Sequence, residues 1–167
     1  MSRAPVRLAV RLHNAAPAAW PRLPRARLLA VLRDAHARHA PRPLPADVRK
    51  RGATLDILFA DDAEIARLHE TFGRGTGPTD VLSFSDGTVD PRTGRTHLGD
   101  VAVGAETALR EAVSRGRRPA DELILYALHG LLHLCGFEDG DDDARAAMFR
   151  AQAAILRRHG LAADDAP

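Results

Sequence analysis

The sequence predicts an α+β domain in which a four-stranded sheet packs with about five helices. Its 167 residues, of which 45% are hydrophobic and 28% charged, are typical of a globular domain with a core of its own. Short segments with strand character occur between longer segments with helical periodicity, and the chain contains no internal repeat. We therefore expect residues 1–167 to form a single domain.

Two strands and two helices are predicted in the first part of the chain. Apolar and polar side chains alternate over residues 6–12, which is typical of a half-buried strand. Residues 25–39 have helical spacing, and three alternating prolines then end the helix in a surface connection. This helix is expected to bury Leu28, Leu29, Leu32 and Ala35. Residues 54–60 predict a buried strand, after which Asp61 and Asp62 can cap a short helix.

A glycine-rich loop, residues 73–79, separates these elements from two further strands. The loop lacks the Lys-Ser/Thr that completes a P-loop, so it does not predict a nucleotide site. The remaining strands are predicted at residues 80–85 and 98–104, and the remaining helices at residues 105–115, 119–136 and 141–159. Pro119 suits the first turn of its helix, and Gly136 and Gly160 suit the ends of the last two helices.

Positive charge is concentrated in the first part of the chain, although the net charge is only +2. Residues 1–60 contain 12 Lys/Arg and 3 Asp/Glu, a balance of +9, whereas residues 61–167 contain 12 and 19, a balance of −7. A coding bias accounts for the use of arginine in place of lysine but not for this uneven distribution. Guanidinium groups bind phosphate well, so a nucleic-acid partner is compatible with the sequence. Candidate contacts are Arg22, Arg25, Arg27 and Arg33.

The sequence argues against secretion, disulfide bonding and membrane insertion. Cys135 is the only cysteine, so no intrachain disulfide is possible and a reducing compartment is expected. The most apolar stretch, residues 123–137, is too short to span a bilayer and contains two histidines. We expect a cytoplasmic protein without a membrane partner, in which Cys135 packs in the core.

Two histidines on the apolar helix predict a metal site. His129 and His133 are separated by one helical turn, close enough to bind the same ion. Gly136 can turn the chain back, and Asp139 follows six residues after His133. The resulting pattern, His-x3-His-x2-Gly-x2-Asp, has the ligand spacing of metzincins with aspartate in place of the third histidine. Three protein ligands leave a position for water, as in catalytic sites.

Two other interpretations fit the histidine pair less well. An isolated His-x3-His pair is also explained by two core histidines that bond to carbonyl groups, but the glycine and the acidic residues after it favour a metal. Metalloproteases place a general-base glutamate directly after the first histidine, whereas position 130 is glycine here. The chain therefore lacks the general base that proteolysis requires.

The segment 129–139, His-Gly-Leu-Leu-His-Leu-Cys-Gly-Phe-Glu-Asp, closely resembles the signature of the YbeY family of bacterial rRNA maturation factors and endoribonucleases. Two further blocks resemble the same family: Pro-Thr-Asp-Val-Leu-Ser-Phe at residues 78–84 and Leu-Gly-Asp-Val at residues 98–101. The order and spacing of the three blocks agree from about residue 54 to residue 160. In the second block, we interpret Thr79, Asp80 and Ser83 as turn and strand residues, with Asp80 behind a metal ligand as the alternative.

The resemblance implies both a fold and a function. The fold would be a mixed four-stranded sheet against helices, with the histidine-bearing helix central. The function would be that of a zinc-dependent, single-strand-selective endoribonuclease in ribosomal RNA maturation, notably at the 3′ end of the small-subunit RNA, and in ribosome quality control. Its partners would be single-stranded RNA, ribosomal RNA and the small ribosomal subunit. One Zn²⁺ per chain would be held by His129, His133 and Asp139.

The chain departs from the family pattern at two functional positions. The third metal ligand of the family is histidine, whereas this chain has Asp139. A carboxylate makes a bound water less acidic, and two histidines with one carboxylate also suit Fe(II), so another divalent transition metal is compatible. The arginine thought to be catalytic in the family is replaced by Gly73, and Arg74 follows one residue later. Arg74 is either a catalytic contact to phosphate or a solvated loop residue.

Two functions of other classes also fit these residues. A non-catalytic ribosome-assembly factor with a structural metal would tolerate the altered ligand and the displaced arginine. Another type of metallohydrolase would share the ligand spacing.

Overall fold

The computed structural model describes residues 7–14, 23–40 and 46–163. Their elements follow the order β1 (Leu8–Asn14), α1 (Arg25–His39), α2 (Ala46–Arg51), β2 (Ala53–Ala60), α3 (Asp62–Thr71), β3 (Val81–Ser85), β4 (Thr96–Gly104), α4 (Ala105–Ser114), α5 (Pro119–Leu134) and α6 (Asp142–Arg158). This is the α+β fold that the sequence predicts. The six-residue helix α2 was not expected, and the predicted start of the first strand at residue 6 lies outside the described residues.

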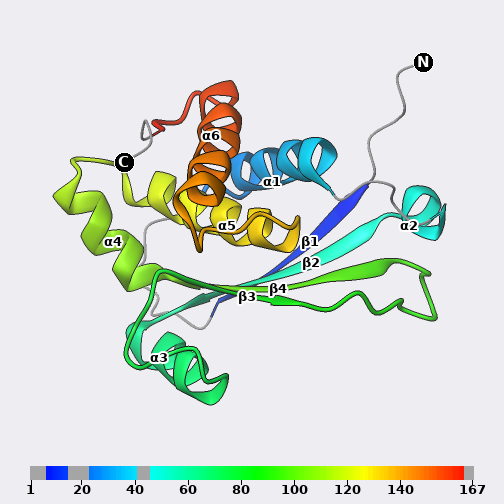
Figure 1. Cartoon of the computed structure of the whole chain (residues 1–167), viewed down its shortest axis with the longest axis horizontal. Coiled ribbons are helices and arrows are strands. Elements are labelled where there is room, and N and C mark those ends of the chain that lie inside the picture. Colours follow the sequence, from blue (N-terminus) through cyan, green and yellow to red (C-terminus); the bar gives the residue numbers. More distant parts are fainter. Residues whose placement is uncertain (1–6, 15–22, 41–45, 164–167) are drawn as a thin grey trace.

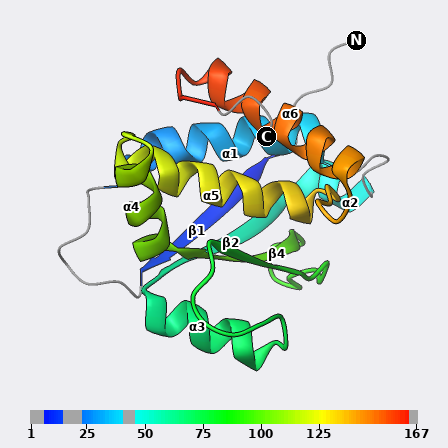
Figure 2. The ribbon, with the colours of Figure 1, turned by 60° about the vertical axis from the view of Figure 1, so that its left-hand side comes forward.

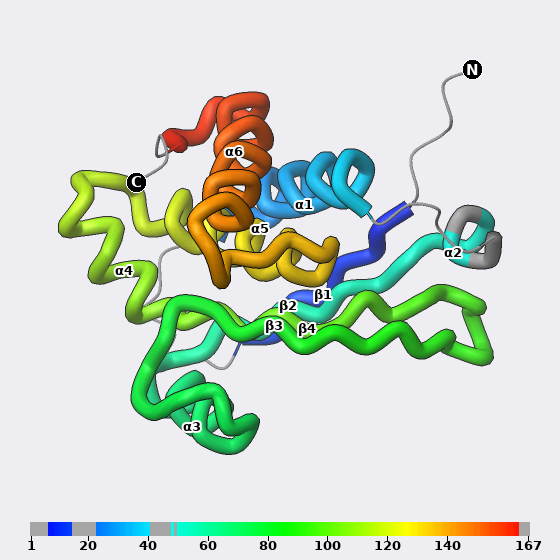
Figure 3. Tube along the Cα trace, viewed as in Figure 1, coloured from blue at the N-terminus to red at the C-terminus, as the bar shows by residue number. Residues whose placement is uncertain are grey.

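The four strands form one mixed sheet in the order β1-β2-β4-β3. β1 and β4 both run parallel to β2, and β3 runs antiparallel to β4. The connection between β3 and β4 extends outward in the direction of α2 (Figure 3). β1 and β3 are therefore the two edge strands of the described sheet.

Helices cover both faces of the sheet, as Figures 1 and 2 show. The larger core lies on the side of α1, α4, α5 and α6, and it includes the alternate residues Leu55, Ile57 and Val101 of the central strands. The intervening residues of the strands face the other way, where Leu82 and Ala102 pack with Ile65 of α3 in a smaller cluster. The period-two alternation of side chains in a strand thus separates the two layers.

The histidine-bearing helix α5 lies at the centre of the larger layer. It contacts α1, α4 and α6 as well as β3 and β4, and most of its side chains are buried. Pro119 begins the helix at a position where no backbone N–H is needed. Gly136, with a φ of 93°, turns the chain directly after the helix, a conformation that favours glycine. The next helix, α6, begins where the Asp141 carboxylate accepts a hydrogen bond from the Ala144 N–H.

Candidate metal centre

The two histidines of α5 face one another across a single helical turn. Nε2 of His129 lies 3.2 Å from Nε2 of His133, and the two rings meet nearly at right angles. The side chains are 18% and 27% exposed, so the pair lies at the border between the core and solvent. The i, i+4 spacing on a helix therefore produces the juxtaposition that the sequence predicts.

The outer nitrogen of each ring is held by an oxygen acceptor. Nδ1 of His129 lies 3.1 Å from Oε1 of Gln152, and Nδ1 of His133 lies 3.0 Å from the carbonyl oxygen of Phe137. An oxygen acceptor places the proton on Nδ1, so both Nε2 atoms direct lone pairs at the same point. The turn at Gly136 brings the Phe137 carbonyl back to the helix.

Asp139 completes the group from the loop between α5 and α6. Its Oδ2 lies 3.9 Å from Nε2 of His129 and 3.7 Å from Nε2 of His133. Two other carboxylates lie in the same loop. Asp141 caps α6, and among the described residues the group formed with the two histidines contains Asp139 and not Glu138. The ligand atoms of the two histidines and Asp139 all lie within 4.8 Å of one another.

This donor set fits a divalent transition metal. Two nitrogens bound tetrahedrally at about 2.0–2.1 Å lie about 3.3 Å apart, close to the separation of the two Nε2 atoms. The half-exposed Asp139 would have to move closer by about 0.5 Å. Burial, together with the neighbouring His133, lowers the pKa of His129, so the neutral ligand form is favoured. Two nitrogen lone pairs that face each other are stabilised by a shared cation.

Gly130 allows α5 to lie directly on the sheet beside the histidines. A Cβ at this position would come within 2.4 Å of Cγ1 of Val101 and 3.0 Å of Cγ2 of Val81. The hydroxyl of Ser83 donates a hydrogen bond to the Gly130 carbonyl, which ties β3 to the helix. The structure therefore leaves no room here for the glutamate that serves metalloproteases as general base.

The polar residues before β3 have hydrogen-bond partners of their own, which fits a structural role in the turn. The Asp80 carboxylate accepts hydrogen bonds from the Thr79 hydroxyl and from the Val81 N–H. Its charge also raises the pKa of His129 slightly, against the larger effect of burial. Cys135 is buried in the core, and burial raises the pKa of its thiol to about 12.

Arg74 lies on the other side of the sheet from the histidines. Its guanidinium stands 5.6 Å from the centre of the Phe84 ring, and Phe84 packs in the cluster under α3. The histidines belong to α5, which covers the opposite face (Figure 2). The structure thus brings the three predicted metal ligands together and places Arg74 across the edge strand β3 from them.

Gln152 is the site residue that sequence reasoning missed. It is buried on the face of α6 that also buries Met148, Ile155 and Leu156. One amide on an otherwise apolar helical face was the available signal, because such a group needs a partner. Its partner, His129, could not be identified without knowing how α5 and α6 cross.

A second group of histidine and carboxylate side chains lies on the sheet face of α3. The ligand atoms of Asp56, His97 and Asp100 are within 4.8 Å of one another. Asp56 also accepts a hydrogen bond from Nε of Arg11 at 2.8 Å and lies 2.7 Å from Nε2 of His13. Because the Asp56 oxygens already have partners, we interpret this group as a polar network that stabilises the sheet.

Within the described part of the chain, no helix is both long enough and apolar enough to span a membrane.

Comparisons with known proteins identify relatives of this chain. The family model described as Endoribonuclease YbeY matches residues 36–160. Endoribonuclease YbeY of Azorhizobium caulinodans is 38% identical over 146 residues, which cover 87% of this chain and 88% of that protein. The protein of the same name from Acidothermus cellulolyticus is 39% identical over 113 residues, 62% of this chain and 69% of its own.

A solved structure shows the same fold. The solution structure of TM1509 from Thermotoga maritima covers 90% of this chain and 89% of its own, with a TM-score of 0.53 and 21% sequence identity. The family match includes α5, Asp139 and Gln152, which together build the candidate metal centre. From the match over most of its length and the identity to these relatives, we conclude that the chain belongs to the endoribonuclease YbeY family.

Proposed function

We propose that this protein is a metal-dependent, single-strand-selective endoribonuclease that acts in ribosomal RNA maturation. Its substrates would be ribosomal RNA in the small subunit, notably the 3′ end, and RNA of defective ribosomes. Family membership and the candidate metal centre support the nuclease activity. The single cysteine supports a cytoplasmic location. One core cluster that extends from Leu8 to Leu161 supports a single domain.

The observation that carries the proposal is the pair of Nε2 atoms 3.2 Å apart, with Asp139 beside them. When bound, a divalent ion supplies Lewis-acid chemistry, because it lowers the pKa of a water or polarises a scissile phosphate. Zn²⁺ suits the two histidines and the carboxylate, and Fe(II) suits the same donors. His129, His133 and Asp139 would hold the ion.

The chain's own residues would orient the ligands and contact the substrate. Gln152 and the Phe137 carbonyl hold the Nδ1 side of each ring, so that the two Nε2 atoms are directed at one point. Asp139, half exposed, leaves the centre open to a polymer on the solvent side. Arg74 would stabilise negative charge on the reacting phosphate, for which it must leave the Phe84 ring and pass the edge of β3.

Cleavage of RNA by the purified protein tests the proposal. Wild type loaded with Zn²⁺ should cut single-stranded RNA internally and leave a matched duplex intact, and a chelator should abolish cleavage. His129→Ala with His133→Ala should lose both bound metal, measured by elemental analysis, and activity. Peptide cleavage would instead show another metallohydrolase. An inactive wild type that unfolds on chelation would show a structural metal, the property of a non-catalytic assembly factor.

The ligand role of Asp139 has its own test, with Asp141 as the matched control. Asp139→Ala should weaken metal affinity by at least tenfold, because it removes one of three ligands. Asp141→Ala should leave metal affinity unchanged and cost about 1 kcal/mol of stability, because Asp141 caps α6. Metal titration and urea unfolding separate the two effects. Metal affinity of Asp139→Ala within a few-fold of wild type would refute the assignment.

A further inference from the structure

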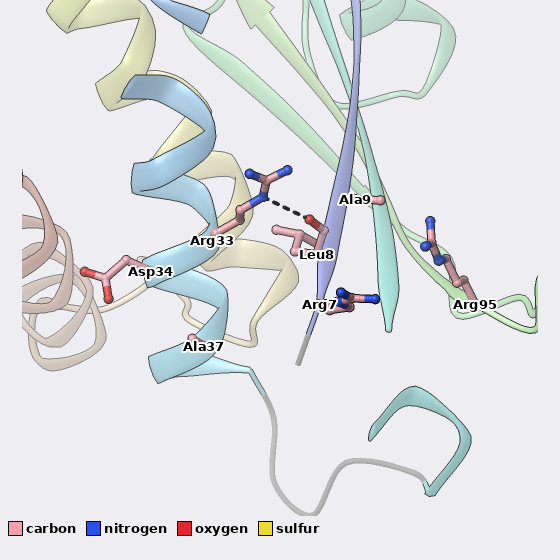
Figure 4. A pocket seen from close by; sticks show the side chains of 7 residues that line it. All are labelled: Arg7, Leu8, Ala9, Arg33, Asp34, Ala37 and Arg95. Carbon is pink, nitrogen blue, oxygen red and sulfur yellow. Dashed lines mark hydrogen bonds between the residues drawn. The ribbon is translucent and has the colours of Figure 1, made fainter. Parts of the chain in front are cut away.

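An arginine-lined hollow lies between α1 and the free edge of β1. It has a volume of about 580 Å³, which is in the range of ligand sites. Three guanidinium groups, those of Arg7, Arg33 and Arg95, line it (Figure 4). They come from three distant segments of the sequence: the residue before β1, the middle of α1 and the residue before β4.

The positive charge of this hollow is not neutralised by the described residues. Within that part of the chain, the side chains of Arg7 and Arg95 form no hydrogen bond or ion pair, and Arg33 donates only to the Leu8 carbonyl oxygen. Asp34 is the one carboxylate among the lining residues. It is already bound to two other arginines, Arg38 and Arg158.

The backbone holds the three arginines in place. Arg7 accepts a hydrogen bond from the Ala53 N–H, next to the start of the β1–β2 pairing. The Arg95 carbonyl accepts from the Asp90 N–H in the turn before β4, and Arg33 lies within α1. Arg33 lies on the α1 side of β1 and Arg95 on its other side (Figure 4), so positive charge lines the hollow from both sides. A ligand with several negative charges relieves the mutual repulsion of these like charges.

We propose that this hollow binds consecutive phosphates of single-stranded RNA. This inference rests on the proposed function, and it assigns the surface of the protein that binds the phosphate backbone of the RNA substrate. Guanidinium groups bind phosphate oxygens bidentately, and phosphates that follow one another along a strand match several separate arginines. The arginine hollow and the metal centre both adjoin the last turns of α1: Ala37 lines the hollow, and His39 contacts the ring of Phe137.

The arginine hollow also revises which basic residues would contact RNA. Arg27 donates to the carbonyl oxygens of His159 and Gly160, so it serves the packing of α1 on α6. Arg25 is exposed at the start of α1 and does not line the hollow, and Arg22 lies outside the described residues. Arg95 enters from the acidic part of the chain, where charge counting along the sequence gave no reason to expect it.

The test is the salt dependence of RNA binding by the full-length metal-loaded protein. A labelled single-stranded oligoribonucleotide is titrated at 50–200 mM salt on ice by fluorescence anisotropy, and gels confirm that it stays intact. The variant is Arg7→Gln with Arg95→Gln. The control is Arg25→Gln with Arg150→Gln, which removes the same charge at exposed positions outside the hollow. Arg33 is kept because it also bonds to β1.

Each phosphate contact contributes about 0.7 to the slope of log affinity against log salt for a single strand. The hollow variant should therefore lose about 1.4 in slope, while the control keeps the wild-type value. An unchanged slope in the hollow variant, or an equal loss in the control, would overturn the assignment. Millimolar inorganic phosphate that displaces RNA from wild type at constant ionic strength would overturn it too, because a free anion would then be the ligand.

The cleavage assay separates this inference from the proposed nuclease function. If wild type cleaves RNA but the hollow variant keeps the wild-type salt slope of RNA binding, the nuclease proposal stands and the assignment of the hollow is refuted. If wild type does not cleave RNA but the salt slope falls in the hollow variant, the nuclease proposal is refuted and the assignment of the hollow as an RNA-binding surface is supported.

Discussion

Gly130→Ala is the substitution for which the structure makes the sharpest stability prediction. In an exposed helix this change stabilises a protein by about 0.8–1.0 kcal/mol, because alanine has the higher helix propensity. Here the new Cβ would lie 2.4 Å from Cγ1 of Val101, about 1 Å closer than an ordinary van der Waals contact. Cγ2 of Val81 and Oγ of Ser83 are also close, at 3.0 Å and 3.1 Å, so the new Cβ is crowded by two strands of the sheet.

The magnitude follows from these two opposed effects. Overpacking of a well-packed contact costs about 1–3 kcal/mol. After the gain in helix propensity, a net destabilisation of about 1–2 kcal/mol remains. Because α5 must move away from β4, His129 moves with it, and metal affinity is expected to fall together with stability.

Urea unfolding of the metal-free protein measures the first effect, and titration with a chelating dye measures the second. Gly140→Ala is the control, since a Cβ there would meet nothing within 4 Å; we expect it to change stability by less than about 0.5 kcal/mol. The sign of the change in the free energy of unfolding of Gly130→Ala decides the outcome. If Gly130→Ala is as stable as wild type or more stable, then α5 does not press on the sheet as described.

Three further predictions test the surroundings of the site and the sheet. Gln152→Ala should lower metal affinity about 10–100-fold, since His129 loses the acceptor for Nδ1, and Gln152→Glu should restore most of it in the same dye titration. Burial acts to raise the pKa of Asp56, but hydrogen bonds led by Arg11 outweigh it and hold the pKa below its usual value. The stability that this pair contributes is therefore present at neutral pH and is lost as the pH falls through that lowered pKa. Arg11→Met should then cost up to about 1 kcal/mol at pH 7 in urea unfolding and little at a pH low enough to protonate Asp56, and an equal cost under both conditions would contradict this. Cys135, with a pKa of about 12, should react with thiol reagents only on unfolding, so rapid reaction of the native protein would show that α5 is more open than described.

The parts of the fold that depend on local sequence could be predicted closely. The helix at residues 25–39 was predicted with both of its bounds, because prolines flank it and its apolar residues recur at helical spacing. Asp61 and Asp141 cap their helices as expected of aspartate before an apolar run. Helix α2 was missed because six residues are too few to show a period.

In the candidate site too, the residues placed by local sequence could be predicted and those placed by tertiary packing could not. His129, His133 and Asp139 lie within eleven residues, so one helical turn and one glycine turn bring them together. The position of Gln152 depends on how two helices cross, which no local pattern encodes. The position of Arg74 depends on which face of the sheet Phe84 occupies. That face is known only once β3 is paired with β4.

The contact between Arg33 and β1 also bears on how copies of the chain behave toward one another. One long side of β1 has no neighbouring strand in the described sheet, and such an edge is a template for pairing with a second chain. Arg33 occupies the Leu8 carbonyl on this side, and the charge of Arg7 lies at its start. To pair with this edge, a second copy of the chain would have to displace the guanidinium of Arg33 and approach that of Arg7. The arginines that we assign to RNA therefore also protect this edge from aggregation, so a chain without them is expected to self-associate while its core is still folded.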